Sequence, residues 1–325
     1  MGLRSLGPVP STRARLAALR MSPISPRAYR LITGAALVAL GAIVVSGAAV
    51  RLTGSGMGCP TWPSCEDGSL VPRGATGGHG WVEFLNRTFT GVVSVAVALA
   101  VLGSRRLRER RRDLTALSWG LVAGVFAQAL LGGLVVLVHV APIAVAGHYL
   151  LSAVLVGTAV LLHHRAGLAE GARRPTATPA VLRLSTLLIA VTTVVLITGT
   201  LVTGSGPHGG DEAADRLPFS VGSVIPFHGA AAWTLLLLAI VALTRAERGD
   251  VDPAAAGRGR LLLAAIAGQG ALGYVQYFTG VPEGLVGLHV LGSVVVWVSV
   301  LRFHLALHEG VPAPDPEPGV AAVTG

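Results

Sequence analysis

The chain has 325 residues, of which 52% are hydrophobic and only 13% charged, and its formal net charge is +9. This composition excludes one or two ordinary soluble domains and is typical of a membrane protein. A helix needs about 20 mostly apolar residues to cross a bilayer. Eight runs meet that length: about 30–50, 82–103, 114–138, 142–162, 183–203, 222–244, 261–280 and 284–303. They are apolar all round, which excludes a soluble bundle with polar outer faces. The predicted fold class is an all-α integral membrane protein with eight transmembrane helices.

The 25 basic residues are all arginines, and they are sorted by side of the membrane. Most lie in the N-terminal arm and in the links 104–113, 163–183 and 245–260, whereas four lie on the opposite side: Arg51, Arg73, Arg87 and Arg216. The positive-inside rule therefore predicts a multi-pass protein with both termini in the cytoplasm. The positive charge indicates contact with anionic lipid headgroups, and we expect no nucleic-acid partner.

Composition also divides the chain into segments. An arm rich in Pro, Ser and Arg precedes the first apolar run, which is too long for a signal peptide and predicts an uncleaved helix. A Pro-rich stretch follows the last run and is typical of disorder. The predicted segments are a cytoplasmic arm (1–28), an N-terminal four-helix half (29–165), a cytoplasmic linker (166–182), a C-terminal four-helix half (183–305) and a disordered tail (306–325).

The two halves contain an internal repeat. Five residues of the first half recur 141 positions later: Gln128, Leu131, Gly132, His148 and Ser152 match Gln269, Leu272, Gly273, His289 and Ser293. Asn86 and His228 are 142 positions apart, and the tetrapeptide Thr53–Gly56 recurs 150 positions later at Thr203–Gly206. Repeats with an even number of helices share one orientation, so matching residues lie at the same depth. The repeat predicts two pseudo-symmetric four-helix bundles.

The segment from Val50 to Arg87 joins the first two runs on the side opposite most arginines, and it contains the only two cysteines, Cys59 and Cys65. That side is oxidising, and the five intervening residues include two prolines that allow a small closed loop. We predict a disulfide between Cys59 and Cys65. Two free thiols, or a pair with a reversible redox role, are the alternatives.

Three predicted helices each have one histidine near the outer end: His148, His228 and His289. An ionisable residue inside a membrane helix is costly and indicates function, although a lone histidine can also be a hydrogen-bonded packing residue. Two imidazoles from facing helices of a bundle form a familiar axial pair for haem iron, and His228 with His289 is such a pair. Zinc is the weaker interpretation, because a third or fourth ligand is missing nearby.

The first half differs, because Asn86 stands where the second half has His228. Asparagine is a poor axial ligand, so we expect this half to hold a haem through His148 alone. Glu83 lies one turn from Asn86 on the same helical face, and a carboxylate at the rim of an apolar pocket can work in proton transfer. The alternative for Glu83 is a simple ion pair with Arg87. His79 lies seven residues before Asn86 and cannot take its place unless the helix starts late. The other histidines are expected at the surface, rim or interface: His139, His163, His164, His208, His304 and His308.

Several of these motifs together resemble the haem A synthase family, over about residues 30–305. They are RLTGSGMGCPTWPSC, WVEFLNR, GSGPHGGD and the histidines 148, 228 and 289. The resemblance implies two four-helix halves side by side in the plasma membrane. It implies that the C-terminal half holds haem b through His228 and His289. It further implies that the N-terminal half takes haem O as substrate, that a methyl group of this haem is oxidised to a formyl group, and that Glu83 is catalytic.

The sequence departs from the family at one position. Many members have E-F-x-H-R in this helix, whereas this chain has Glu83-Phe-Leu-Asn-Arg87. The resemblance implies a membrane oxidoreductase that converts haem O to haem A for a haem–copper oxidase, with haem b as cofactor and the haem O-forming farnesyltransferase as partner. A di-haem b-type electron carrier and a haem-handling transporter are the alternatives, and the oligomeric state stays open.

Overall fold

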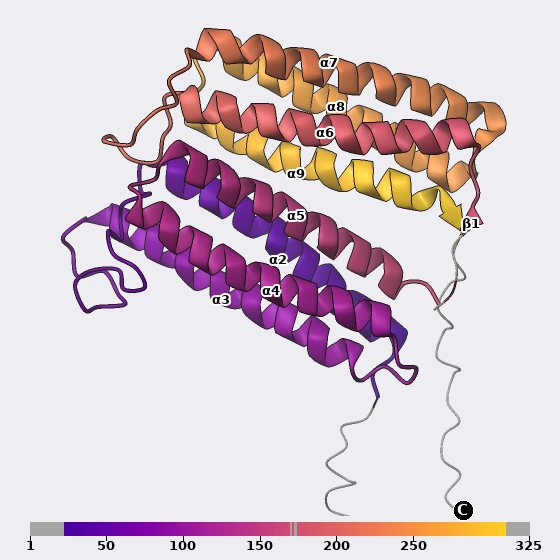
Figure 1. The fold of residues 1–325 in the computed structure, drawn as a ribbon, viewed down its shortest axis with the longest axis horizontal. Helices are drawn as coiled ribbons and strands as arrows, with labels where there is room; N and C mark the ends of the chain where they lie inside the picture. Colours follow the sequence, from indigo (N-terminus) through magenta and orange to yellow (C-terminus); the bar gives the residue numbers. More distant parts are fainter. Residues whose placement is uncertain (1–22, 170, 172–173, 310–325) are drawn as a thin grey trace, which may run out of the picture.

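The computed structural model describes residues 23–169, 171 and 174–309, and most of these lie in long helices (Figure 1). In chain order the helices are α2 (Pro26–Leu52), α3 (Gly78–Ser104), α4 (Arg112–Leu137), α5 (Pro142–Ala166), α6 (Pro179–Ser205), α7 (Val221–Arg245), η1 (Ala246–Asp250), α8 (Pro253–Phe278) and α9 (Glu283–Ala306). Eight helices in the described part of the chain are long and apolar enough to cross a membrane. The predicted all-α, eight-span fold is confirmed, and the chain is a multi-pass membrane protein.

Helix starts follow local capping rather than the edges of the apolar runs. Helices α2, α5, α6 and α8 all begin on a proline, whose missing N–H costs nothing at the first helical position. Asp252 caps α8 by accepting a hydrogen bond from the Ala254 amide at 2.8 Å. Helix α8 therefore begins eight residues before the expected position 261.

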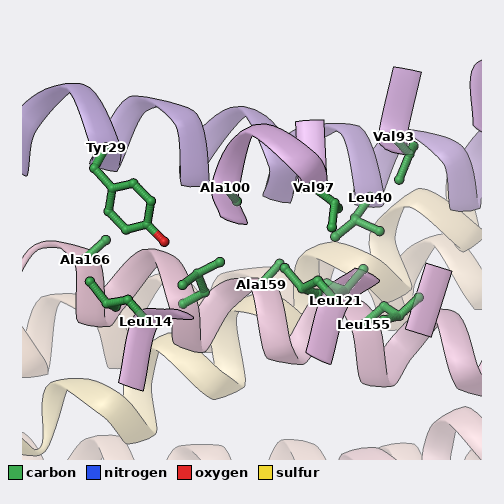
Figure 2. Close-up of a cluster of buried hydrophobic side chains, with 12 residues drawn as sticks. Tyr29, Leu40, Val93, Val97, Ala100, Leu114, Leu121, Leu155, Ala159 and Ala166 are labelled. Atoms are coloured by element: carbon green, nitrogen blue, oxygen red, sulfur yellow. The ribbon is translucent and has the colours of Figure 1, made fainter. Parts of the chain in front are cut away.

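Figure 1 shows the two halves as neighbouring bundles, α2–α5 and α6–α9, with α2 and α5 facing α9 and α6. Each half has its own apolar core. In the first half, side chains from all four helices meet (Figure 2), among them Tyr29, Val97, Leu121 and Leu155. Close packing of such side chains stabilises each bundle through van der Waals contact, since lipid gives no hydrophobic driving force between helices.

Buried positions of the first half recur in the second half at two different spacings, and the sequence motifs indicate only one of them. Leu121 and Leu262 are both buried, and so are Ala36 and Leu188. The first pair is 141 positions apart, as in the repeat found from the sequence, but the second is 152 apart. The recurring tetrapeptide, at 150, is therefore two residues out of register with the helices that lead into it. Between the matched buried residue and this tetrapeptide, α2 has two more residues than α6.

Large apolar side chains also cover the outside of the bundles. Val38, Phe126, Ile143, Phe227 and Phe278 are each at least 66% exposed. An apolar surface of this extent is costly in water and suits contact with lipid, in agreement with helices that are apolar all round.

The bundles meet along a seam with two hydrogen bonds across it. The Tyr149 hydroxyl lies 2.8 Å from Ser293 Oγ, and Trp297 Nε1 donates to the Ala153 carbonyl at 2.8 Å. Tyr149 directly follows His148, and Ser293 lies one turn after His289. The seam thus runs between the two candidate sites.

Regular structure extends beyond two predicted boundaries. The strand β1 (Arg174–Pro175) pairs antiparallel with β2 (His308–Glu309), and Leu307 is fully buried, so the expected tail from 306 is ordered as far as Glu309. The expected arm 1–28 also contains the start of α2. The rest of these two segments, 1–22 and 310–325, lies outside the described residues.

Two of the histidines predicted to be interfacial, His163 and His304, make hydrogen bonds between helices of their own half. His163 Nδ1 lies 3.1 Å from the Thr33 hydroxyl, and His304 Nδ1 lies 2.9 Å from the Ser185 hydroxyl. Each bond joins the last helix of a half to the first helix of that half. These two histidines are therefore matching packing residues of the repeat.

Candidate haem sites

In the second half, the imidazoles of His228 on α7 and His289 on α9 face each other. Their ring centroids are 6.5 Å apart, and the ring planes are 64° apart. Two metal–nitrogen bonds of about 2 Å, plus about 1 Å from each nitrogen to its ring centre, require centroids about 6 Å apart. The pair therefore fits one metal between two imidazoles. Two imidazoles at this spacing fit a haem iron, whose porphyrin supplies the other ligands. In the described part of the chain no three His, Cys, Asp or Glu side chains gather as a metal-ion site.

Both rings lie against a glycine of the neighbouring helix. A Cβ at Gly199 on α6 would lie 3.3 Å from His228 Cε1, and one at Gly273 on α8 would lie 3.1 Å from His289 Cε1. The Thr198 hydroxyl lies 3.1 Å from His228 Nδ1. With Nδ1 engaged by a hydroxyl, Nε2 is the nitrogen left for iron, because a hydrogen bond at one ring nitrogen fixes the role of the other.

In each half, a glutamine donates a hydrogen bond to the backbone carbonyl of the matching histidine. Gln269 Nε2 donates to the His289 carbonyl at 2.8 Å, and Gln128 Nε2 donates to the His148 carbonyl at 3.0 Å. Gly292 makes room for the Gln269 amide, which any added side chain there would strike. The sequence repeat had already singled out Gln128 and Gln269. It could not predict that each one binds a histidine carbonyl.

In the first half, the α4–α5 side of the site matches the second half. His148 Cε1 lies 3.2 Å from a Cβ placed at Gly132, as His289 lies against Gly273. The α2–α3 side differs. Asn86 Oδ1 accepts a hydrogen bond from Ser46 Oγ at 2.7 Å. Ser46 is the mate of Thr198 in the 152-residue register, so Asn86 occupies the position of His228 in bonding as well as in sequence.

Glu83 is buried, with 5% of its surface exposed, and its carboxylate accepts three hydrogen bonds. Arg87 donates through Nε at 3.0 Å and through Nη2 at 2.6 Å, both to Oε1, and the Cys59 amide donates to Oε2 at 2.8 Å. The ion pair that the sequence offered as the alternative is therefore present. Glu83 is also tied to the cysteine loop, which spacing alone did not predict.

The cysteine loop (Cys59–Cys65) is closed by the predicted disulfide, which the structure confirms. Arg87 donates to three of its carbonyls, those of Cys59, Thr61 and Ser64. Trp62 lies against Gly133 on α4, where an added Cβ would be 2.5 Å from Trp62 Cδ2. Gly133 adjoins Gly132, the glycine beside His148. The loop is therefore clamped over the first half, next to the helix pair that holds His148.

The second outer segment ties the halves together. The Gly56 amide donates to the Gly210 carbonyl at 2.7 Å, and Arg51 Nη1 donates to the His208 carbonyl at 2.7 Å. His208 Nε2 lies 2.8 Å from the Val281 carbonyl. The motif GSGPHGGD thus connects α2 to the start of α9. The contacts of Arg51 and Ser46 could not be predicted from the sequence, because Arg51 stood out only by its side of the membrane and its motif, and the match of Ser46 to Thr198 is offset from the recurring tetrapeptide.

Similar proteins include three named Heme A synthase. The chain is 33% identical to that of Lysinibacillus sphaericus (strain C3-41) over 129 residues, 39% of this chain and 41% of the relative. It is 29% identical to that of Alkalihalophilus pseudofirmus over 136 residues, 41% and 45% of the two chains. It is 31% identical to that of Geobacillus thermodenitrificans over 97 residues, 29% of each chain. The chain spans less than half the length of these relatives.

A family model described as cytochrome oxidase assembly protein matches residues 29–226. The match covers more than half of the chain, including Glu83, Asn86 and His148, and ends two residues before His228. The chain belongs to the COX15-CtaA family of cytochrome oxidase assembly proteins.

Proposed function

We propose that this protein converts haem O to haem A by oxidising a porphyrin methyl group to a formyl group, with haem b in the second half as cofactor. One observation carries the proposal. The second half has two imidazoles at the spacing of an axial pair, whereas its first-half counterpart has one imidazole and an asparagine. A chain with one retained haem and one exchangeable haem needs this asymmetry, because two histidine ligands hold a haem more tightly than one.

In the second half, His228 and His289 hold the cofactor, and Thr198 and Gln269 orient them. Haem b supplies one-electron redox chemistry when bound. His228 and His289 would hold this haem, and the protein's contribution is to keep the two imidazoles at a fixed spacing.

In the first half, His148 is the sole protein ligand to the substrate iron, and Asn86 lies opposite it. The conversion removes four electrons and adds one oxygen atom, and dioxygen as oxidant balances it as R–CH3 + O2 → R–CHO + H2O. Glu83, one turn from Asn86, would accept a proton released at the methyl group as it is oxidised. Its three hydrogen bonds hold the carboxylate in a fixed position, which general-base catalysis requires. The proposed reaction implies two partners. The farnesyltransferase that makes haem O would supply the substrate, and a haem–copper oxidase would receive haem A.

The protein lies in the plasma membrane with both termini in the cytoplasm. The arginine distribution supports this orientation. The cysteine loop then lies on the oxidising side, where its disulfide is stable.

Pigment extraction from the purified protein tests the proposal. We expect haem b together with haem O and haem A. His228→Ala and His289→Ala should each remove the low-spin haem b spectrum, whereas His139→Asn, an exposed turn position with φ of 51° that asparagine tolerates, should keep it. Two permanently bound b haems without haem O or haem A would instead favour the electron carrier. Full low-spin haem b in both alanine variants would contradict the ligand assignment.

A further inference from the structure

Asn86 has a hydrogen-bonding arrangement that leaves its amide donor free. Ser46 has one hydroxyl proton and two oxygen neighbours, the Ile43 carbonyl at 3.1 Å and Asn86 at 2.7 Å. A separation of 2.7 Å is typical of O–H···O and short for N–H···O, so the oxygen of Asn86 faces Ser46 and accepts its proton. The Asn86 Nδ2 group then points away from Ser46. In the described part of the chain, this group donates to no other residue.

The space beside Asn86 is large enough for a bigger side chain, as a comparison with His228 in the second half shows. In the second half, His228 lies against Gly199, 3.3 Å from an added Cβ. In the first half, the matching glycine is Gly47, and nothing lies within 4 Å of a Cβ added there. The asparagine amide ends about one bond, roughly 1.3 Å, short of an imidazole Nε2. Asn86 therefore stops before the distance of a metal bond and presents an N–H donor instead.

From this arrangement we propose that Asn86 donates a hydrogen bond to a small exogenous ligand of the dioxygen class on the open face of the first-half haem iron. The inference rests on the proposed function, because it takes His148 as the ligand on the other face. The first half is then a ligand-binding haem site and the second half a closed one. Ser46 is the positioning residue that keeps the amide donor directed at the ligand.

Carbon monoxide binding to the reduced, haem-loaded full-length protein tests the inference. We expect the wild type to bind carbon monoxide at the first-half haem only, with a C–O stretching frequency lowered by the Asn86 N–H. Asn86→Leu has a similar size and lacks the donor. It should raise the stretching frequency and speed carbon monoxide dissociation about tenfold, the effect expected from losing one hydrogen bond. Ser46→Ala should shift the frequency in the same direction.

Two reciprocal variants provide matched controls. Asn86→His should place a second imidazole against Gly47, give a six-coordinate low-spin haem and abolish carbon monoxide binding at that half. His228→Asn, beside Thr198, should create a carbon monoxide-binding haem in the second half. Wild-type protein that binds no carbon monoxide, or an Asn86→Leu stretching frequency equal to that of the wild type, would overturn the inference. Extracted pigments report separately on the proposed function, since haem O, haem A and haem b contents do not depend on the carbon monoxide measurement.

Discussion

At the scale of single residues, Glu83 combines a structural contact with a proposed chemical role. Its carboxylate fastens Arg87 and the Cys59 amide, and through Arg87 it helps to hold three carbonyls of the cysteine loop. A loss of activity on changing Glu83 therefore has two explanations, one through the loop and one through proton transfer, and a test has to separate them.

Glu83→Gln removes the charge and keeps the shape, and its amide oxygen can still accept from the Cys59 amide. Its NH2 group then faces Arg87, so the state of the loop has to be measured in the same variant. If the carboxylate moves a proton, haem A formation should fall by about 100-fold or more, while the haem b spectrum and the rate of tryptic cleavage after Arg73 in the adjoining segment stay as in the wild type. Faster cleavage together with the loss of haem A would show that Glu83 acts through the loop. A wild-type yield of haem A would exclude the chemical role.

Gln269 gives a second prediction at this scale. Gln269→Leu removes the bond to the His289 carbonyl, so retention of haem b should fall about tenfold, as expected for one buried hydrogen bond. Gln128→Leu makes the same change in the first half and should leave haem b in place. The measurement is haem b content after dilution of the purified protein, and equal losses in both variants would contradict a local role.

Site residues could be predicted from the sequence only where the internal repeat contains the same residue in both halves. His148, His228 and His289 were evident because two of them recur at one spacing. The hydroxyls of Ser46 and Thr198 were not, because serine and threonine are common in membrane helices and a difference of two residues hides their register. Only contact between helices identifies which hydroxyl meets which imidazole.

At the scale of elements, the cysteine loop meets α4 at one close approach, that of Trp62 to Gly133. Gly133→Ala should push the indole away and cost about 1–3 kcal/mol, the usual effect of overpacking. Trypsin should then cleave faster after Arg73, which lies in the same outer segment, and the yield of haem A should fall. Gly120→Ala on the same helix meets nothing within 4 Å and serves as the control. Equal cleavage rates in the two variants would show that Trp62 does not hold the loop.

Helix ends illustrate why sequence patterns locate elements better than they delimit them. Apolar runs predicted all eight helices, because the membrane requires length and hydrophobicity. The runs mark only the part of a helix in lipid. Residues such as Pro253 and Asp252 extend α8 into the polar region by capping, and the paired strands β1 and β2 are too short to be predicted from two residues each.

At the scale of the whole molecule, the arginine distribution predicts which end faces the cytoplasm. Single cysteines introduced as Asp215→Cys and Arg248→Cys, both at exposed positions, provide the test, since the native cysteines are bonded to each other. In intact cells a membrane-impermeant maleimide should label the first variant, and it should label the second only after permeabilisation. The reverse pattern would overturn the proposed orientation.

The seam between the halves has the contact pattern of a two-fold assembly. Helix α5 packs against α9, its own repeat mate, and the remaining contacts across the seam include the reciprocal pairs α2 with α9 and α5 with α6. A two-fold axis produces such reciprocal contacts when identical subunits associate. The seam therefore has the form of a former homodimer interface, in which a four-helix ancestor met its own copy before gene duplication and fusion. Two polypeptides made by cutting this chain between Leu168 and Arg174 should accordingly reassemble when coexpressed, detectable as co-purification with a restored haem b spectrum. Each half made alone should favour pairing with itself, and of these self-pairs only the C-terminal one inherits two bis-histidine sites.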